Sequence, residues 1–234
     1  MTINSTIRDF AASATQDALR AFRGLAATGT ISPSGTVNFV ERVPGEQAAV
    51  SIGYNGPFFT DRDLEPTIHA LDGTVLDGAR NGNLGGARYL PLFRAHDDLT
   101  SVSHFHTPYL GAWSQSHRPL PIRYVPVQRW TRAREIPIYI DRRGGEANFI
   151  LNELTRDDPA PAILEANGGS TAWGYKGLLA LANDLVLLEE GARLQALAET
   201  LGGSKPYGPG VLEQQWKMSG LIRDTDQFEV ASAA

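Results

Sequence analysis

The sequence predicts an α/β fold of three layers, α/β/α, whose central sheet is mostly antiparallel. Three observations lead to this prediction: an N-terminal segment with helical apolar spacing, a run of short strand-like segments, and two late helices. No internal repeat and no linker divides the 234 residues, so we expect a single domain over 1–234. The residues from about 224 onward are expected to form a frayed tail.

The first element is a long helix, and two hairpins follow it. Apolar residues recur at helical spacing from about Ser5 to Ala27, and Gly29 supplies the stop. Asp72-Gly73 favours a tight turn in the second hairpin, where His69 alternates with apolar neighbours and is expected to face solvent. The hairpin strands are expected over 36–40, 48–52, 67–71 and 74–76.

Helices and short strands alternate in the rest of the chain. Glycine and proline mark most of the boundaries between these segments. Further strands are expected over 123–130, 136–140 and 160–165. Helices are expected over 89–95, 108–115, 146–155, 175–201 and 211–218.

Composition excludes several classes of protein. The net charge is −5, from 21 basic and 26 acidic residues. The sequence has no run of basic residues that would indicate a surface for nucleic acid or an anionic membrane. The chain has no cysteine, so it has no disulfide, no thiolate metal site and no cysteine nucleophile. We find no signal-peptide pattern and no apolar stretch near the ~20 residues that span a bilayer. A cytoplasmic protein is expected.

The most informative stretch is Ser103-His104-Phe105-His106-Thr107-Pro108. In a strand, alternation sends both imidazoles to the same face, and Pro108 would end the strand there. Such a pair can give two nitrogen ligands to one metal ion or set two bases around one substrate. The alternative is a pair of partly exposed strand histidines without a function.

Other side chains could complete a site around this pair. Glu165 lies at a strand end and could supply a carboxylate, because a site with only two imidazoles binds metal poorly. Tyr109 could act as a phenol donor, and with His104 and His106 it forms the candidate catalytic set. Arginines could hold a carboxylate in a bidentate manner, and tryptophans could line an aromatic pocket. The candidate substrate-binding residues are Arg118, Arg123, Trp113 and Asn83.

Four segments, taken in order, resemble the class II aldolase/adducin family. The first segment is similar to the hairpin that precedes the active-site loop in this family. The last is similar to the end of a strand that leads to the family's last long helix. The resemblance covers most of the chain, from about residue 15 to residue 203. The segments are Asp72–Gly78, Leu92–His106, Ser116–Pro121 and Ile163–Gly169, the last followed by Gly174 and the long helix.

This resemblance implies a three-layer α/β/α fold, a homotetramer with active sites between subunits, and a divalent metal (Zn, Mn or Fe) held by three histidines, often with a glutamate. His104 and His106 match the first two ligands, and the third position falls on Gly168. The stretch that should carry the glutamate, 85–89, has no carboxylate. The phosphate-binding loops also differ, which argues against a phosphorylated sugar. The later half is more similar to the branch that acts on aromatic carboxylates by decarboxylation or iron-dependent oxygenation.

Three functions remain open at this stage. The first is a lyase that acts on a C–C bond next to a carbonyl or carboxylate of a non-phosphorylated small molecule, with an incomplete metal site. The second is a metal-independent isomerase or cyclase that uses the two histidines as acid and base. The third is a non-catalytic assembly module, as in the adducin branch. The two missing metal-site residues weigh against the lyase, and the presence of both histidines weighs against the assembly module. We favour the lyase, with the metal-independent enzyme as the alternative.

Overall fold

The computed structural model describes residues 3–60, 62–78, 84–208 and 210–222. In these residues the chain forms an eight-stranded sheet in the order β4-β3-β2-β1-β5-β10-β9-β8. All neighbouring strands are antiparallel except β8 and β9, which are parallel. The strands are β1 (Val37–Arg42), β2 (Ala48–Gly53), β3 (Thr67–Ala70), β4 (Val75–Asp77), β5 (Ser101–Phe105), β8 (Ile138–Tyr139), β9 (Ala162–Glu165) and β10 (Ser170–Gly174).

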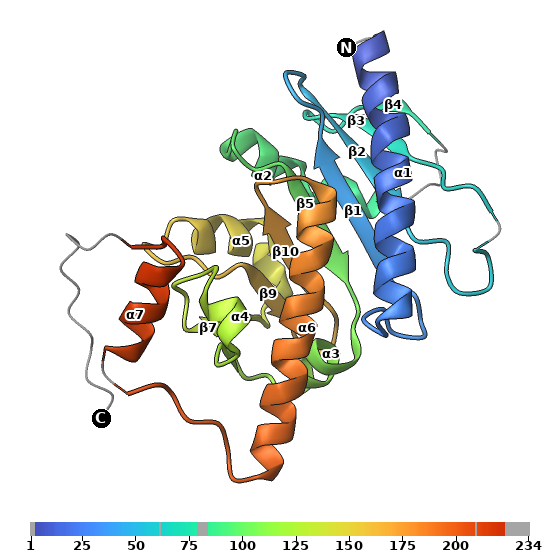
Figure 1. Cartoon of the computed structure of the whole chain (residues 1–234). Helices are drawn as coiled ribbons and strands as arrows, with labels where there is room; N and C mark the ends of the chain where they lie inside the picture. Colours follow the sequence, from blue (N-terminus) through green and yellow to red (C-terminus); the bar gives the residue numbers. More distant parts are fainter. Residues whose placement is uncertain (1–2, 61, 79–83, 209, 223–234) are drawn as a thin grey trace.

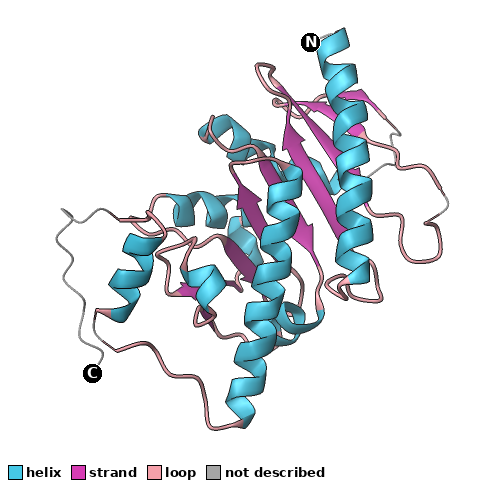
Figure 2. Cartoon of the chain, in the orientation of Figure 1, coloured by secondary structure: helices cyan, strands magenta, loops and turns pink. Residues whose placement is uncertain are grey.

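Helices cover both faces of this sheet, as Figures 1 and 2 show. On one face α1 and α6 lie side by side, and α3 packs against α6. On the other face a 3-10 helix over Leu84–Tyr89 and two short helices form a second apolar layer. The helices are α1 (Ser5–Ala27), α2 (Leu90–Ala95), α3 (Pro108–Ser114), α4 (Val125–Gln128), α5 (Glu146–Leu154), α6 (Leu178–Thr200) and α7 (Val211–Met218). A small two-stranded sheet joins β6 (Leu120–Pro121) to β7 (Glu135–Ile136).

The long helices begin where polar groups satisfy their first N–H groups. The Asn4 side chain accepts a 2.9 Å hydrogen bond from the Ile7 N–H and caps α1. At the start of α6, the Leu178 N–H donates to Glu41 Oε1 at 2.9 Å. Gly177 has φ +87°, a conformation that favours glycine and prevents the helix from beginning earlier. The predicted helix over 175–201 therefore begins three residues later, at Leu178.

The three-layer fold with a mostly antiparallel sheet is confirmed, and so are both hairpins. The predicted strand over 123–130 is wrong: Pro126 lies in the first turn of the short helix α4, where its missing N–H costs no hydrogen bond. The solvent-facing position of His69 is also wrong. Both faces of β3 are covered, so His69 is fully buried and burial lowers its pKa.

The tail predicted from about 224 lies outside the described residues. Among the helices that are described, none is long and apolar enough to cross a membrane.

Candidate active site

Strand β5 lies in the middle of the sheet and brings the two histidines together. His104 lies between Asn38 on β1 and Thr171 on β10. His106 follows the end of the strand, where its N–H donates to the Thr36 carbonyl at 2.8 Å. The two Nε2 atoms are 3.2 Å apart, and the rings meet edge to face at 70°. The predicted placement of both imidazoles on one face is therefore confirmed.

Glu165, at the end of β9, contacts the His104 ring at Nδ1, the nitrogen that does not face His106. His104 Nδ1 lies 2.9 Å from Glu165 Oε1 and 3.2 Å from Thr171 Oγ1. We assign the proton to Nδ1 from this contact, which leaves a lone pair on Nε2 toward His106. Burial alone would raise the pKa of Glu165, but the hydrogen bond and charge of His104, together with Arg88, lower it to about 2. Glu165 is thus ionised at neutral pH.

A second carboxylate, that of Glu146, lies next to Thr171 and comes from helix α5. Glu146, in the first turn of α5, accepts a hydrogen bond from Tyr89 Oη at 2.8 Å and another from Thr171 Oγ1. Arg88 Nε lies 3.3 Å from Glu146 Oε2. Burial and the nearby Glu165 charge raise the pKa of Glu146. Thr171 therefore connects the two carboxylates with His104.

The pKa of His106 is lower than that of an ordinary histidine. Burial, and after it the neighbouring His104, lower the pKa of His106. A histidine with a lowered pKa is neutral near pH 7, so its ring can accept a proton or a metal ion.

The turn between β9 and β10 is fitted closely to the site. A Cβ atom on Gly169 would overlap the His106 ring and the Phe105 carbonyl oxygen. A Cβ atom on Gly168 would lie 3.1 Å from Nη2 of Arg142. Ser114 Oγ donates to the Gly168 carbonyl at 3.0 Å and ties the turn to α3. The turn needs glycine at position 169, because a side chain there would displace the His106 ring or the Phe105 carbonyl, whereas at position 168 the end of the Arg142 side chain would have to move only slightly.

The remaining predicted site residues have other surroundings. Trp113 is buried in the core, where its Nε1 donates to the Pro119 carbonyl at 3.1 Å, and Arg118 lies over its ring. The Tyr109 N–H donates to Glu189 Oε1 at 2.7 Å. The Nε of Arg123 is buried and has no hydrogen-bond partner among the residues that the structure describes. Asn83 lies outside the described residues. Within the described part of the chain, we find no hydrogen bond, ion pair or ring contact between Tyr109, Trp113, Arg118 or Arg123 and either site histidine.

Sequence reasoning missed five side chains of this cluster. Thr171 carried no alternation signal, because every residue of β10 is buried. The other four come from distant segments, and only the fold brings them to the histidines. The missed residues are Arg88, Tyr89, Arg142, Glu146 and Thr171.

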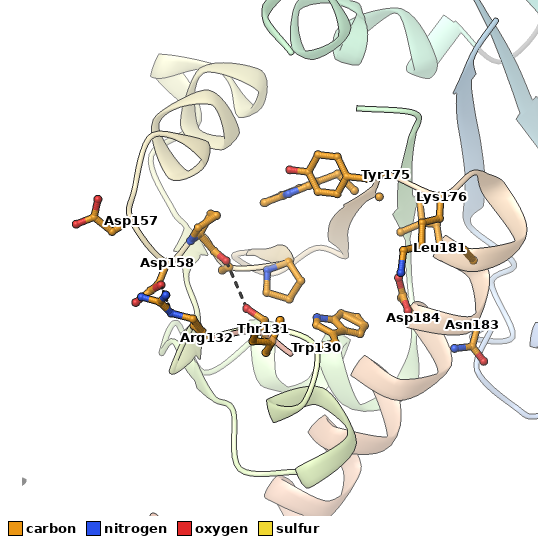
Figure 3. A pocket seen from close by; sticks show the side chains of 17 residues that line it. Trp130, Thr131, Arg132, Asp157, Asp158, Tyr175, Lys176, Leu181, Asn183 and Asp184 are labelled. Atoms are coloured by element: carbon orange, nitrogen blue, oxygen red, sulfur yellow. Dashed lines mark hydrogen bonds and ion pairs between the residues drawn. The ribbon is translucent and has the colours of Figure 1, made fainter. Parts of the chain in front are cut away.

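A second region lies at the other end of β9 and β10. It is a cavity of about 560 Å³, and Figure 3 shows Tyr175 and Trp130 on opposite sides of it. Arg132 and Asp158 form a 2.7 Å ion pair at its wall. Asp184, in α6, also lines the cavity, and burial raises its pKa to about 6.

Comparisons with known proteins agree with this architecture. Residues 46–196 match the family model described as the class II aldolase and adducin N-terminal domain. The L-ribulose-5-phosphate 4-epimerase UlaF of Salmonella paratyphi B is 24% identical over 177 residues, which cover 70% of this chain and 75% of the relative.

Solved structures extend the likeness to nearly the whole chain. An L-fuculose 1-phosphate aldolase superposes with a TM-score of 0.73 at 18% identity, covering 93% of this chain and 97% of that one. YgbL of Escherichia coli, titled a putative aldolase/epimerase/decarboxylase, gives a TM-score of 0.66 at 22% identity, covering 88% and 99%. At these identities the structural matches support the fold.

Proposed function

Because the chain belongs to the class II aldolase and adducin family, we propose that it is an enzyme of lyase type. The proposed reaction makes or breaks a C–C bond next to a carbonyl or carboxylate, by aldol chemistry or decarboxylation. The observation that carries this proposal is the convergence of His104 Nε2 and His106 Nε2 at 3.2 Å, with Glu165 behind His104.

The residues present fit a divalent metal ion. Two nitrogens bound to one tetrahedral ion at about 2.0–2.1 Å lie roughly 3.3 Å apart, which is close to the spacing of the two Nε2 atoms. The Glu165–His104 contact is the arrangement in which a carboxylate orients a metal-binding imidazole. His104, Glu146 and Glu165 also form a group whose ligand atoms lie within 4.8 Å of one another. His104 and His106 would hold the ion and leave positions open for substrate, since Gly168 supplies no third imidazole.

When bound, such an ion (zinc, manganese or iron) would polarise a substrate oxygen and stabilise negative charge on it. The chain's own groups have separate tasks. Glu165 keeps His104 in one orientation and one tautomer. Neutral His106 can offer the lone pair of Nε2 to the ion.

We propose a non-phosphorylated substrate, although the names of two relatives specify sugar phosphates. The stretch 52–56 carries a tyrosine where the family resemblance leads us to expect small hydroxyl residues. The ring of this residue, Tyr54, packs against Phe22 with 5.3 Å between centroids. An aromatic carboxylate remains our preferred class. A single domain, a homotetramer and a cytoplasmic location also remain proposals.

A metal-free isomerase or cyclase is the second candidate. It is favoured by one observation: Glu165 and His104 form a buried acid–base pair next to a histidine with a lowered pKa. In that case His106 would act as a base, and activity would fall as pH decreases through the range in which this imidazole gains its proton.

The test is the metal content per subunit of protein purified without an affinity tag. We expect near one equivalent of zinc, manganese or iron in the wild type, and none after His104→Ala/His106→Ala. The matched control is His117→Asn, which removes an exposed imidazole from a left-handed position (φ +53°) that asparagine tolerates. Assays with non-phosphorylated aldols and aromatic carboxylates should follow, and His106→Ala should lose the activity found. If the wild type takes up no ion even from excess metal, the metal-dependent lyase is wrong and the metal-free enzyme replaces it.

A further inference from the structure

Arg142 lies across the double-glycine turn from His106. A Cβ on Gly168 would lie 3.1 Å from Arg142 Nη2, and a Cβ on Gly169 would overlap the His106 ring. The guanidinium of Arg142 and the imidazole of His106 therefore contact two adjacent glycines of the same turn.

One nitrogen of Arg142 fixes the position of the guanidinium. Nη2 donates to the Ala166 carbonyl at 3.2 Å and lies 3.9 Å from Glu165 Oε2. Because Glu165 Oε1 contacts His104, the same carboxylate links Arg142 with the histidine pair. The guanidinium is therefore tied to the site by both the turn and Glu165.

The rest of the guanidinium is available. Among the described residues, Nε and Nη1 of Arg142 have no hydrogen bond or ion pair, and the side chain is 60% exposed. Nε–H and the Nη1 N–H groups point in different directions and form no fork by themselves. Whichever N–H of Nη2 donates to the Ala166 carbonyl, the other N–H of Nη2 pairs with Nε or with Nη1 in a planar fork that matches the two oxygens of a carboxylate. The neighbouring Arg143 differs, because its Nε and Nη2 already bind both oxygens of Asp141 at 2.8 and 2.6 Å.

We propose that Arg142 binds the carboxylate of the substrate and thereby selects small carboxylic acids for this site. This assignment rests on the proposed function, because it names the substrate class of the same site. The carboxylate would lie on the open side of the double-glycine turn, and the rest of the substrate would face His106.

The test measures equilibrium binding without turnover. Full-length protein is titrated with benzoate and with benzamide, which has a similar shape and no charge, by NMR or calorimetry. We expect the wild type to prefer benzoate by about tenfold or more, as charge-assisted bidentate hydrogen bonds predict. Arg142→Gln should abolish this preference, Arg142→Lys should retain part of it, and Arg143→Gln should behave as the wild type.

Three results would overturn the proposal. In the first, the preference for benzoate survives Arg142→Gln. In the second, Arg142→Gln weakens both ligands equally, as expected if Arg142 only supports the turn and Glu165. In the third, the wild type shows no preference. Since no outcome depends on metal content or turnover, this proposal can hold while the lyase assignment fails, and the reverse.

Discussion

At the two ends of strands β9 and β10, the pKa of a carboxyl group is shifted in opposite directions. At the histidine end, Glu165 is buried but contacts His104, and its pKa is lowered to about 2. At the cavity end, Asp184 is half-buried without a salt bridge among the described residues, and burial raises its pKa to about 6. Burial penalises charge in both places, so the partner decides the sign of the pKa shift. The carboxylate paired with His104 can orient a functional group, whereas burial of Asp184 outweighs its interactions with Lys176 and Asn183 and costs stability.

The largest effect is expected from removing the paired carboxylate. Glu165→Ala should destabilise the fold by about 3 kcal/mol and weaken metal binding on the order of 10–100-fold, because it removes the charged acceptor of the His104 Nδ1–H and leaves only the longer contact with Thr171 Oγ1. Denaturant unfolding and metal titration measure the two effects. Glu190→Ala removes a glutamate paired at 3.5 Å on the surface and should cost under about 0.5 kcal/mol. Equal losses in both variants would show that burial makes no difference to the pair.

The same pair gives a pH dependence. The pKa of Glu165 is lower in the folded chain than its ordinary value of 4.5, so its stabilisation is present above pH 4.5. It is lost as pH falls toward the folded pKa of about 2. The difference in stability between wild type and Glu165→Gln should therefore shrink over this range.

A smaller effect is expected from filling the turn. Gly169→Ala should cost about 2 kcal/mol and displace the His106 ring, because the added methyl overlaps the ring and the Phe105 carbonyl. Thermal unfolding and a histidine NMR spectrum would record both changes. In contrast, Gly111 lies inside α3 with no atom within 4 Å of an added Cβ, so Gly111→Ala should stabilise by about 0.5–1 kcal/mol. Retention of the His106 signals in Gly169→Ala would contradict the close fit.

The smallest effect is expected at the cavity end. Since the pKa of Asp184 is raised to about 6, the folded chain holds this proton more tightly than the unfolded chain, and stability falls as pH rises from about 4 to 6. Asp184→Asn should therefore stabilise by about 1 kcal/mol at pH 8, after allowance for solvent screening, and by almost nothing below pH 4. Asp157→Asn, an exposed carboxyl on the same cavity, is the control. Stabilisation that does not change with pH would contradict this account.

The sequence was most informative where a pattern is local. Alternation in β5 predicted the facing imidazoles, and the Asp72-Gly73 turn predicted its hairpin. It was misleading at His69, because alternation cannot show that a strand is covered on both faces. Glu146 and Arg142 could not be found in this way, since packing between layers brings Glu146 to Thr171 and the turn after β9 brings Arg142 to Glu165.

The position of β5 in the sheet also bears on how the chain acquires its activity. His104 is hydrogen-bonded to residues 66 positions before it and 67 after it. Contacts so distant in sequence form slowly. Two long loops must close, at a cost in entropy, before hydrogen bonds to β1 and β10 can stabilise β5. A chain emerging from the ribosome therefore has no binding site until β10 has been added. A ligand that recognises only the finished sheet would raise the population of folded protein by mass action.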